Sequence, residues 1–424
     1  MEQSTGRFPS DRPRRLYFGW ILVGVLGITT IVSYGTTYYA FGVIVVPISN
    51  DLASSRAALS GAYSLSLLLA GILGFPIGGL VDHYGPRLLM VAGNLIGGLV
   101  LIALSTVGEV WQFDALWGIG LGLATALTFY PVSFTVVANW FQRRRGSALA
   151  WLTTIGGLAS PVFIPLIGWL VPHYGWRETL VLLGLAQFVI AVPLHATLLR
   201  RHPEDLGLRP DGQVAPDPAL RTPVKVSSSS GVTLSTAVAN RVFWALTVAG
   251  GLEQLAAMVV AVHQIPFMIA RGFDPVFAAG IAGLVGLVSL PGRFLLNQLS
   301  DRVGSQRLLA LVLAVLGLGV VVFTVATSVA GLYAYVAVSG VAFGARSPLR
   351  ASVMADHFGR RAYGAITAVN GVVIAVPAAL GPLVAGWLYD TLGNYQLAFW
   401  LTAAVLGIAA GIVFLTPRPA RPRA

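Results

Sequence analysis

Three charged side chains lie inside long apolar stretches of this sequence, and their types could bind a charged ligand or carry a proton. They are Glu253, Arg293 and Arg346. A charge at the centre of a bilayer costs about 2.5–3.5 kcal/mol, so such a side chain normally faces a cavity or a partner. A guanidinium can hold a carboxylate through two hydrogen bonds without losing its proton. We therefore expect an organic anion to bind at Arg293 first and at Arg346 second, with Glu253 available for protons.

The depth of these residues allows an ion pair. With a rise of 1.5 Å per helical residue, Glu253 and Arg293 would lie within about 3–5 Å of each other in depth. In one hypothesis, protonation of Glu253 frees the Arg293 guanidinium for an anion. In the other, the two residues form a permanent structural pair. For Arg346, the alternative to lining the site is an anchoring contact near the inner end of its helix. Asp356 and that helix end could equally anchor Arg350, which lies one turn further inward.

Polar and aromatic residues in the apolar stretches could complete a pocket. Individually, such hydroxyl groups more often bond to their own helix, and single aromatic rings are mostly packing residues. As a set, they describe a pocket for a small organic anion with an apolar body. His263 lies ten residues after Glu253 and could either relay protons or pack near the interface. The substrate-binding candidates beside the arginines are Tyr34, Thr37, Tyr38, Tyr130 and Asn370.

The composition indicates that membrane helices position these residues. The chain has 56% hydrophobic and 10% charged residues, and its mean hydropathy is +0.79. A spanning helix needs about 20 apolar residues, and backbone groups in lipid must be satisfied within the helix. We predict an all-α membrane protein with twelve transmembrane helices. The predicted spans are roughly 17–46, 57–81, 88–107, 112–138, 147–171, 177–199, 242–270, 276–300, 308–327, 331–356, 362–388 and 395–416.

The positive charge follows membrane topology rather than a nucleic-acid surface. The net charge is +11, but most cations fall in segments that are cytoplasmic if the amino terminus is cytoplasmic, as the positive-inside rule requires. Only Arg56, Arg177 and Arg271 then fall in external loops. The first apolar run is too long for a signal peptide and stays as a helix. We expect a multi-pass plasma membrane protein with both termini cytoplasmic and no nucleic-acid partner.

A short signal occurs twice and indicates an internal duplication. Residues 78–87 read GGLVDHYGPR, and residues 301–307 read DRVGSQR. The similarity between the two copies continues downstream, where Pro131 aligns with Pro348. In the same alignment, Phe129 corresponds to Arg346. Residues 200–240 are polar and rich in Pro, Ser and Gly, which favours a flexible cytoplasmic linker. The predicted organisation is a first six-helix bundle (1–199), a linker (200–240) and a second six-helix bundle (241–424).

The pattern G-x-x-x-D-x-x-G with a following cation, whose D-x-x-G part is repeated in the second half, resembles the signature of the major facilitator superfamily. Two six-helix halves related by duplication fit that family. A carboxylate at a helix end can accept hydrogen bonds from a neighbouring helix and pair with arginine, which would latch the two halves. The alternative is that these residues only fix loop geometry. The predicted gating residues are Asp82, Arg87, Asp301 and Arg302.

Further segments resemble the monocarboxylate porter and oxalate/formate antiporter branch. They are residues 17–20 (YFGW), 140–146 (WFQRRRG), 175–177 (GWR) and 203–207 (PEDLG). The resemblance implies that the arginine of the eighth helix, Arg293, binds the substrate carboxylate. Animal monocarboxylate porters carry an Asp one turn earlier, where this chain has Ser289. The fourth and fifth helices lack the basic residue and the glycine pattern of drug exporters.

Together these patterns predict a secondary transporter of a small organic anion, most simply a monocarboxylate, working by proton-coupled symport and alternating access. An organic anion exchanger is the alternative, and a proton-driven drug exporter is third. The sequence lacks the G-x-S-x-G and H-E-x-x-H motifs of enzymes. It contains no cysteine, and we expect no metal and no cofactor. We expect a monomer, and the near absence of lysine hints at a bacterial inner membrane.

Overall fold

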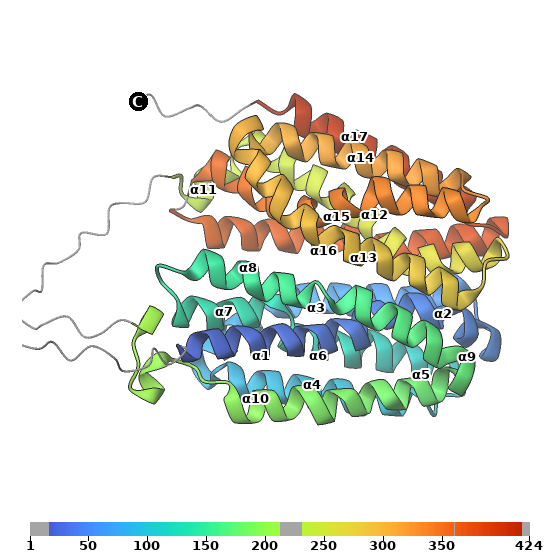
Figure 1. Cartoon of the computed structure of the whole chain (residues 1–424), viewed down its shortest axis with the longest axis horizontal. Coiled ribbons are helices and arrows are strands. Elements are labelled where there is room, and N and C mark those ends of the chain that lie inside the picture. Colours follow the sequence, from blue (N-terminus) through green and yellow to red (C-terminus); the bar gives the residue numbers. More distant parts are fainter. Residues whose placement is uncertain (1–16, 213–230, 360, 418–424) are drawn as a thin grey trace, which may run out of the picture.

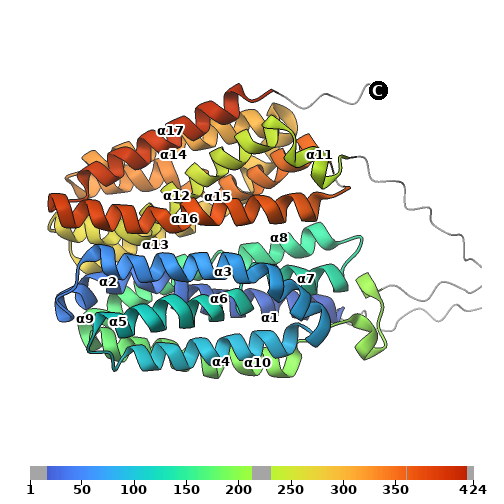
Figure 2. The ribbon, with the colours of Figure 1, turned by 180° about the vertical axis from the view of Figure 1, so that it is seen from behind.

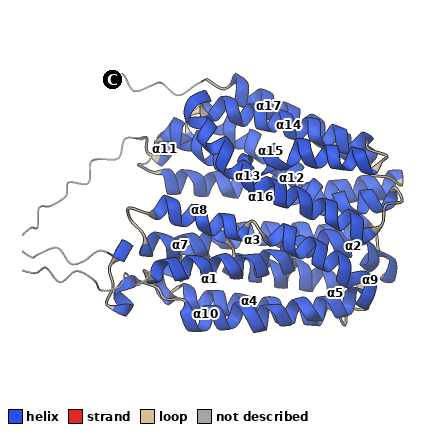
Figure 3. Cartoon of the chain, viewed as in Figure 1, coloured by secondary structure: helices blue, strands red, loops and turns tan. Residues whose placement is uncertain are grey.

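A computed structural model of the chain describes residues 17–212, 231–359 and 361–417. Over these residues the chain is built from helices joined by loops (Figure 3). The central part of the predicted linker lies outside the described residues. Large apolar side chains such as Leu99, Val189 and Leu311 are exposed on the helices, as expected where lipid covers the surface. The chain is therefore an integral, multi-pass membrane protein.

The first half contains six crossings, several of which include a π-helical segment. Its elements are α1 (Phe18–Ser33), η1 (Tyr34–Tyr39), α2 (Ala40–Asp51), α3 (Arg56–Tyr84), α4 (Pro86–Leu104), α5 (Val110–Phe113), η2 (Asp114–Leu121), α6 (Gly122–Thr128), α7 (Tyr130–Trp140), α8 (Arg145–Gly156), α9 (Ala159–Ala186), η3 (Gln187–Ala191) and α10 (Val192–Leu198). The segments α1, η1 and α2 follow one another without a break and form one crossing.

The second half is more regular, with one uninterrupted helix for each crossing. Short elements connect it to the first half: η4 (Pro203–Leu206), η5 (Pro210–Gly212) and α11 (Leu234–Val238). The crossings are α12 (Arg241–Ala270), α13 (Pro275–Val303), α14 (Ser305–Val325), α15 (Val329–Phe358), α16 (Tyr363–Leu392) and α17 (Gln396–Leu415).

The described residues contain 11 apolar helical stretches long enough to cross a membrane. One of them, Arg145–Leu198, has 54 residues and would measure about 80 Å if straight, which is far longer than a bilayer is thick. It turns back at Gly175, whose φ is +86°. The stretch therefore makes two crossings, and the predicted total of twelve is confirmed.

Two six-helix bundles lie side by side with their helices nearly parallel. Figure 1 shows α1–α10 in one layer and α12–α17 in the other, and Figure 2 shows the same division from behind. The beginning of α1, the end of α17 and the elements between the halves lie at one end of the bundles, which we call the linker end. The opposite end is the distal end. The arrangement agrees with the predicted major facilitator fold.

The repeated sequence signal produces the same turn in both halves. Gly85 (φ +79°) separates α3 from α4, and Gly304 (φ +92°) separates α13 from α14. Side chains other than glycine rarely adopt these positive φ values. Glycine at this place in the signal therefore lets the chain reverse direction within a single residue in each half.

The linker is ordered where it leaves the first half. Asp211 accepts hydrogen bonds from the backbone N–H groups of Gln142, Arg143 and Arg144, at 3.0, 2.7 and 3.2 Å. Although burial raises the pKa of the Asp211 carboxyl, these N–H groups outweigh it and hold the pKa below its ordinary value of 3.8. The beginning of the predicted flexible linker is thus attached to the loop between α7 and α8.

Candidate functional site

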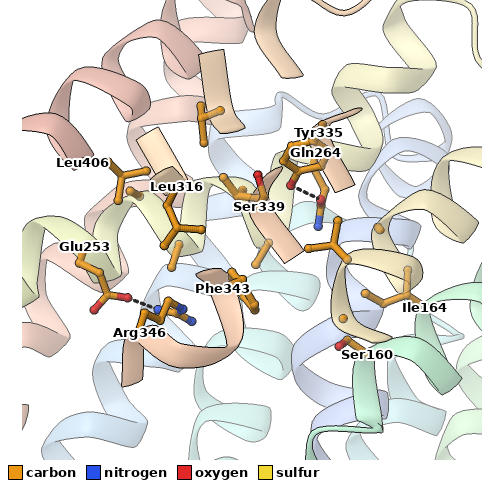
Figure 4. A pocket seen from close by; sticks show the side chains of 18 of the residues that line it. Ser160, Ile164, Glu253, Gln264, Leu316, Tyr335, Ser339, Phe343, Arg346 and Leu406 are labelled. Atoms are coloured by element: carbon orange, nitrogen blue, oxygen red, sulfur yellow. Dashed lines mark hydrogen bonds and ion pairs between the residues drawn. The ribbon is translucent and has the colours of Figure 1, made fainter. Parts of the chain in front are cut away.

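A cavity lies between the two halves and is lined mainly by the second half. It contains about 660 Å³ of space free of protein atoms, including its open side. Helices α12 and α15 supply most of its polar side chains, and the first half contributes Tyr39, Ser160 and Ile164. Figure 4 shows Glu253 and Arg346 at one end of the cavity and Gln264 and Tyr335 at the other. A cavity of this kind, mostly apolar with a few converging polar groups, is typical of a small-molecule site.

The charged end of the cavity holds one carboxylate between two guanidinium groups. Glu253 Oε1 forms an ion pair with Arg346, and Oε2 lies 2.5 Å from Arg350 Nη1. Arg346 also donates to the side-chain oxygen of Gln254 at 3.0 Å and lies over the ring of Phe343 at 4.5 Å. The Glu253 side chain is only 3% exposed, whereas those of Arg346 and Arg350 are 14% and 26% exposed. The deeper residue is therefore the carboxylate, and the guanidiniums lie nearer to open space.

Spacing on α15 explains why both arginines reach Glu253. Arg346 and Arg350 are four residues apart, so they lie on the same face of the helix, one turn from each other. Glu253 also borders a second, smaller cavity, which is lined by Arg350. With all three groups ionised, the cluster carries a net charge of +1. The excess positive charge can attract an anion to this end of the cavity.

The predicted ion pair between Glu253 and Arg293 is wrong for this structure, because both carboxylate oxygens bind the arginines of α15. Arg293 instead donates from Nη1 to the carbonyl of Thr153 in α8, at 2.5 Å. It also interacts with the hydroxyl group of Tyr130. Its Nε atom is buried without a hydrogen-bond partner in the described part of the chain. Arg293 is therefore a contact between the halves, with donor capacity left over.

The distal end of the interface is closed by a helix cap that crosses between the halves. The Asp390 carboxylate at the end of α16 accepts from the backbone N–H groups of Arg56 and Ala57, at 2.9 and 2.7 Å. These are the first residues of α3. A carboxylate at a helix N-terminus satisfies free N–H groups and interacts favourably with the helix dipole. The contact therefore holds the two halves together at this end.

Helices α3 and α16 continue this contact inward and then separate toward the linker end. The backbone of Gly386 packs on Arg56, and Gly71 packs on Ala375. Beyond this point, the glycines of both helices border open space: no other atom lies within 4 Å of where a side chain would begin at Gly74, Gly78, Gly79, Gly364 or Gly371. The interface is thus closed at the distal end and open at the linker end.

Comparison with known families identifies this architecture. The model of the Major Facilitator Superfamily matches residues 26–373 and 311–424. The chain belongs to this superfamily. It is accordingly a membrane transporter and not an enzyme, and the large-scale change that this fold supports is a rocking of the two halves around a central site.

Relatives within the superfamily are named as transporters. Monocarboxylate transporter 13 of Bos taurus is 27% identical over 404 residues, which cover 94% of this chain and 89% of the relative. Monocarboxylate transporter 2 of Rattus norvegicus is 25% identical, with 94% and 82% covered. Agnestins efflux protein AgnL12 of Paecilomyces divaricatus is 26% identical, with 92% and 83% covered. The resemblance to the monocarboxylate porter branch is confirmed at this level of identity.

Solved structures support the same fold. A bacterial homolog of the human lysosomal transporter Spinster, in an inward-facing and unoccupied conformation, has a TM-score of 0.71 and 16% identity, and the match covers 94% of this chain and 97% of that chain. The nucleoside transporter NupG has a TM-score of 0.70 and 14% identity, with 94% and 99% covered. At these identities the structures establish the major facilitator fold alone.

Of the predicted substrate-binding residues, Arg346 lines the cavity. Tyr38 and Tyr34 belong to the first half. Tyr38 donates from its hydroxyl group to Met258 Sδ across the interface at 3.0 Å. Tyr34 stacks on Phe129 with ring centroids 3.7 Å apart. Among the described residues that line the cavity, the first half contributes the neighbouring Tyr39 and neither of these two tyrosines.

The remaining candidates are used inside their own half. Thr37 donates to the Ser33 carbonyl of its own helix at 2.7 Å, and Asn370 donates to the Thr247 hydroxyl at 2.9 Å. His263 is buried, with Nε2 at 2.9 Å from the Pro382 carbonyl, while Nδ1 has no partner among the described residues. None of these three residues is among the described residues that line the cavity. Their predicted roles in substrate binding or proton transfer therefore have no direct support from its lining.

The predicted gating residues lie at the linker end. Asp82 and Asp301 are near the ends of α3 and α13, although nothing of their side chains is described. Arg87 and Arg302 are exposed. Because the interface is open at this end, a latch between these residues would form in a different state of the transporter.

Sequence reasoning missed the polar residues at the far end of the cavity. Gln264, Tyr335 and Ser339 all line it. The signal was present in the spacing: residues 335, 339, 343, 346 and 350 follow steps of four and three, so they share one face of α15. A search for polar residues on the face that carries Arg346 would have found Tyr335 and Ser339.

Proposed function

We propose that this secondary transporter moves a small organic anion, most simply a monocarboxylate, together with a proton. The observation that carries the proposal is the buried Glu253 carboxylate bound to two arginines, one of which lines the cavity between the halves. A cluster with one more cation than anion favours an anionic ligand. A carboxylate that can be neutralised next to that ligand offers a means of coupling.

The coupling follows from competition for Arg346. While Glu253 is ionised, its oxygen occupies the Arg346 guanidinium, and an incoming carboxylate would have to displace it. Protonation removes the negative charge that holds the pair, and a substrate carboxylate can then bind the same donors through charge-assisted hydrogen bonds. Gln254, which already accepts from Arg346 at 3.0 Å, keeps the guanidinium in place.

Arg293 is the second cation of the proposed site. It reaches across the interface to the Thr153 carbonyl, so a substrate that recruited its free donors would change a contact between the halves. Relatives named as monocarboxylate transporters support the class of substrate. Their identities of 25–27% support that class and no particular acid.

The test is uptake of labelled lactate and pyruvate into proteoliposomes under an imposed pH gradient. We expect accumulation in the wild type when the outside is acidic. In Glu253→Gln we expect the response to the gradient to be lost, while exchange of external for internal substrate persists. Gln254→Ala is the matched control, because it removes a neutral partner of the same arginine without changing the charge.

Three outcomes separate the candidate functions. Accumulation driven by the gradient in Glu253→Gln would contradict the proton role of this residue. Uptake by the wild type that requires internal anion and ignores the gradient would favour an exchanger. Transport of apolar or cationic compounds in place of acids would favour the drug exporter.

A further inference from the structure

We infer that the cavity binds an elongated organic anion, with its carboxylate at the Glu253–Arg346 end and a second, uncharged polar group at the Gln264–Tyr335 end. This inference rests on the proposed function, which supplies the carboxylate. It adds a distal hydroxyl, carbonyl or amide group and an apolar body between the two polar ends. Compact acids such as lactate satisfy only the charged end.

The two polar ends are pairs of residues on the same two antiparallel helices. Arg346 of α15 binds Glu253 of α12, and Tyr335 of α15 donates to Gln264 of α12 at 3.2 Å. Each pair is separated from the other by eleven residues on both helices. That separation corresponds to about 16 Å along the helix axes. The cavity therefore extends along α12 and α15 with a polar pair at each end (Figure 4).

The far end has hydrogen-bonding capacity that the protein does not use. Gln264 and Tyr335 are 7% and 2% exposed. Because the Gln264 oxygen accepts from Tyr335, its amide N–H groups are left to donate, and no acceptor for them is recorded among the described residues. Ser339, on the same face of α15 and 3% exposed, has an Oγ atom without a partner in the described part of the chain. Buried polar groups are nearly always paired, so these groups point to a polar ligand group.

The middle of the cavity is apolar, and its α12 side is made mostly of small residues. Between its two polar residues, α12 presents Ala256, Ala257, Val260 and Ala261 to the cavity. Leu316 and Val320 of α14 and Phe343 of α15 complete this part. Small side chains on α12 leave room that a longer hydrocarbon or aromatic body would fill. Polar groups at both ends then fix the orientation of such a ligand.

Burying the polar groups of the far end without hydrogen-bond partners costs binding free energy. This cost determines how strongly the site should prefer a ligand with a distal polar group. A ligand that is apolar at its distal end would bury the Gln264 amide and the Ser339 hydroxyl without partners. A site built to hydrogen-bond a ligand hydroxyl therefore discriminates against the analogue that lacks it. With water able to replace part of the contact, we expect a preference of about tenfold.

The experiment compares two elongated acids that differ by one hydroxyl group, 5-(4-hydroxyphenyl)pentanoate and 5-phenylpentanoate. Their dissociation constants are measured by calorimetry on the purified full chain in detergent. We expect the hydroxylated acid to bind about tenfold more tightly to the wild type. In Gln264→Leu, which keeps the approximate size of the side chain, the ratio should fall to near one. Tyr335→Phe provides a second, smaller change at the same end if Gln264→Leu does not fold.

The controls separate failure of this inference from failure of the proposed function. Thr402→Val removes a buried hydroxyl group of α17 that bonds to its own helix, and it should keep the tenfold ratio. Equal affinities for the two acids, or no binding of either, overturn the inference. If lactate still binds to the wild type and is lost in Arg346→Gln, the proposed anion site stands. If acids bind equally well to Arg346→Gln, the proposed function fails as well.

Discussion

The two halves of the transporter bury polar side chains of different kinds. In the first half, His195 Nε2 lies 2.9 Å from Thr29 Oγ1, and Nδ1 lies 3.0 Å from Asn94 Nδ2. Asn94 also accepts from Ser33 at 3.1 Å and donates to the Met90 carbonyl at 2.7 Å. This set is uncharged if His195 is neutral with its proton on Nε2, which is the tautomer that the partners favour. In the second half, the buried set is the charged cluster around Glu253.

The difference shows that two halves with the same helical arrangement use their buried polar side chains for different purposes. The uncharged set of the first half joins α1, α4 and α10, and its donors and acceptors largely match each other. The charged set of the second half has an excess cation and borders the cavity. Arg346 aligns with Phe129 of the first half, which stacks on Tyr34 instead of forming an ion pair. We conclude that the first half uses its buried polar groups to join its own helices, whereas the second half presents charged groups to the cavity.

Removal of Glu253 should have the largest effect, because it breaks the charged set. In Glu253→Ala two guanidiniums lose their buried partner, which typically costs about 3–5 kcal/mol. We expect a strongly lowered midpoint of thermal unfolding in detergent. Glu178→Ala, which changes an exposed glutamate, is the control and should leave the midpoint nearly unchanged. An unshifted midpoint in Glu253→Ala would mean that the two arginines do not depend on this carboxylate.

The uncharged set should respond less strongly. His195→Ala removes one hydrogen-bond partner from Thr29 and one from Asn94, and we expect a loss of about 1–3 kcal/mol in the free energy of unfolding. The pH dependence of transport should stay as in the wild type. His173→Ala, which changes an exposed histidine, is the control and should leave the free energy of unfolding nearly unchanged. A changed pH profile in His195→Ala would show that the first half also takes part in proton coupling.

The contact between the halves at the distal end should be weaker still. Asp390→Ala removes the carboxylate that caps α3, and caps of this type contribute about 0.5–2 kcal/mol. We expect faster labelling of a single cysteine introduced by Gly61→Cys, which faces Leu383 of α16, by a membrane-impermeant maleimide. Asp274→Ala is the control, because Asp274 caps α13 within its own half. Equal labelling rates in the two variants would contradict a role for Asp390 in closure.

The smallest effect is expected at Asp211, which attaches the linker to the first half alone. Its pKa is lowered in the folded chain, so its stabilising contribution is present above pH 3.8 and is lost as the pH falls through the lowered pKa. At pH 7, Asp211→Asn should only speed hydrogen exchange at the amides of residues 142–144. Asp205→Asn is the control, since Asp205 binds the backbone of His202. Unchanged exchange in Asp211→Asn would contradict the attachment.

The fold was readable from the sequence because long apolar stretches can satisfy their backbone groups only as helices. The repeated signal added the duplication, and its glycines give the same turn at Gly85 and Gly304. The predicted spans 147–171 and 177–199 appear as one helical stretch in the structure, yet the turn at Gly175 keeps them as two crossings.

The site was predicted only in part, because depth along a helix says nothing about rotation around its axis. Glu253 and Arg293 match in depth, but α13 directs Arg293 toward Thr153 of the other half. The sequence favours an anchoring role for Arg350 near the inner end of its helix, although its position one turn from Arg346 puts it on the same face. Spacing on α15 indicates Tyr335 and Ser339, but the pairing of Tyr335 with Gln264 depends on how α12 and α15 are rotated against each other. The spacing within one helix does not determine that rotation.

The composition of the Glu253 cluster has an electrical consequence for the transport cycle. Moving one elementary charge through the membrane potential is worth about 2.3 kcal/mol per 100 mV. The ionised cluster carries +1 when empty, and a proton bound together with a monovalent anion leaves this value unchanged. Voltage would then act equally on the loaded and the empty step, and the cycle as a whole would be electroneutral. An anion bound without a proton would lower the charge to zero, so only the empty step would feel the potential.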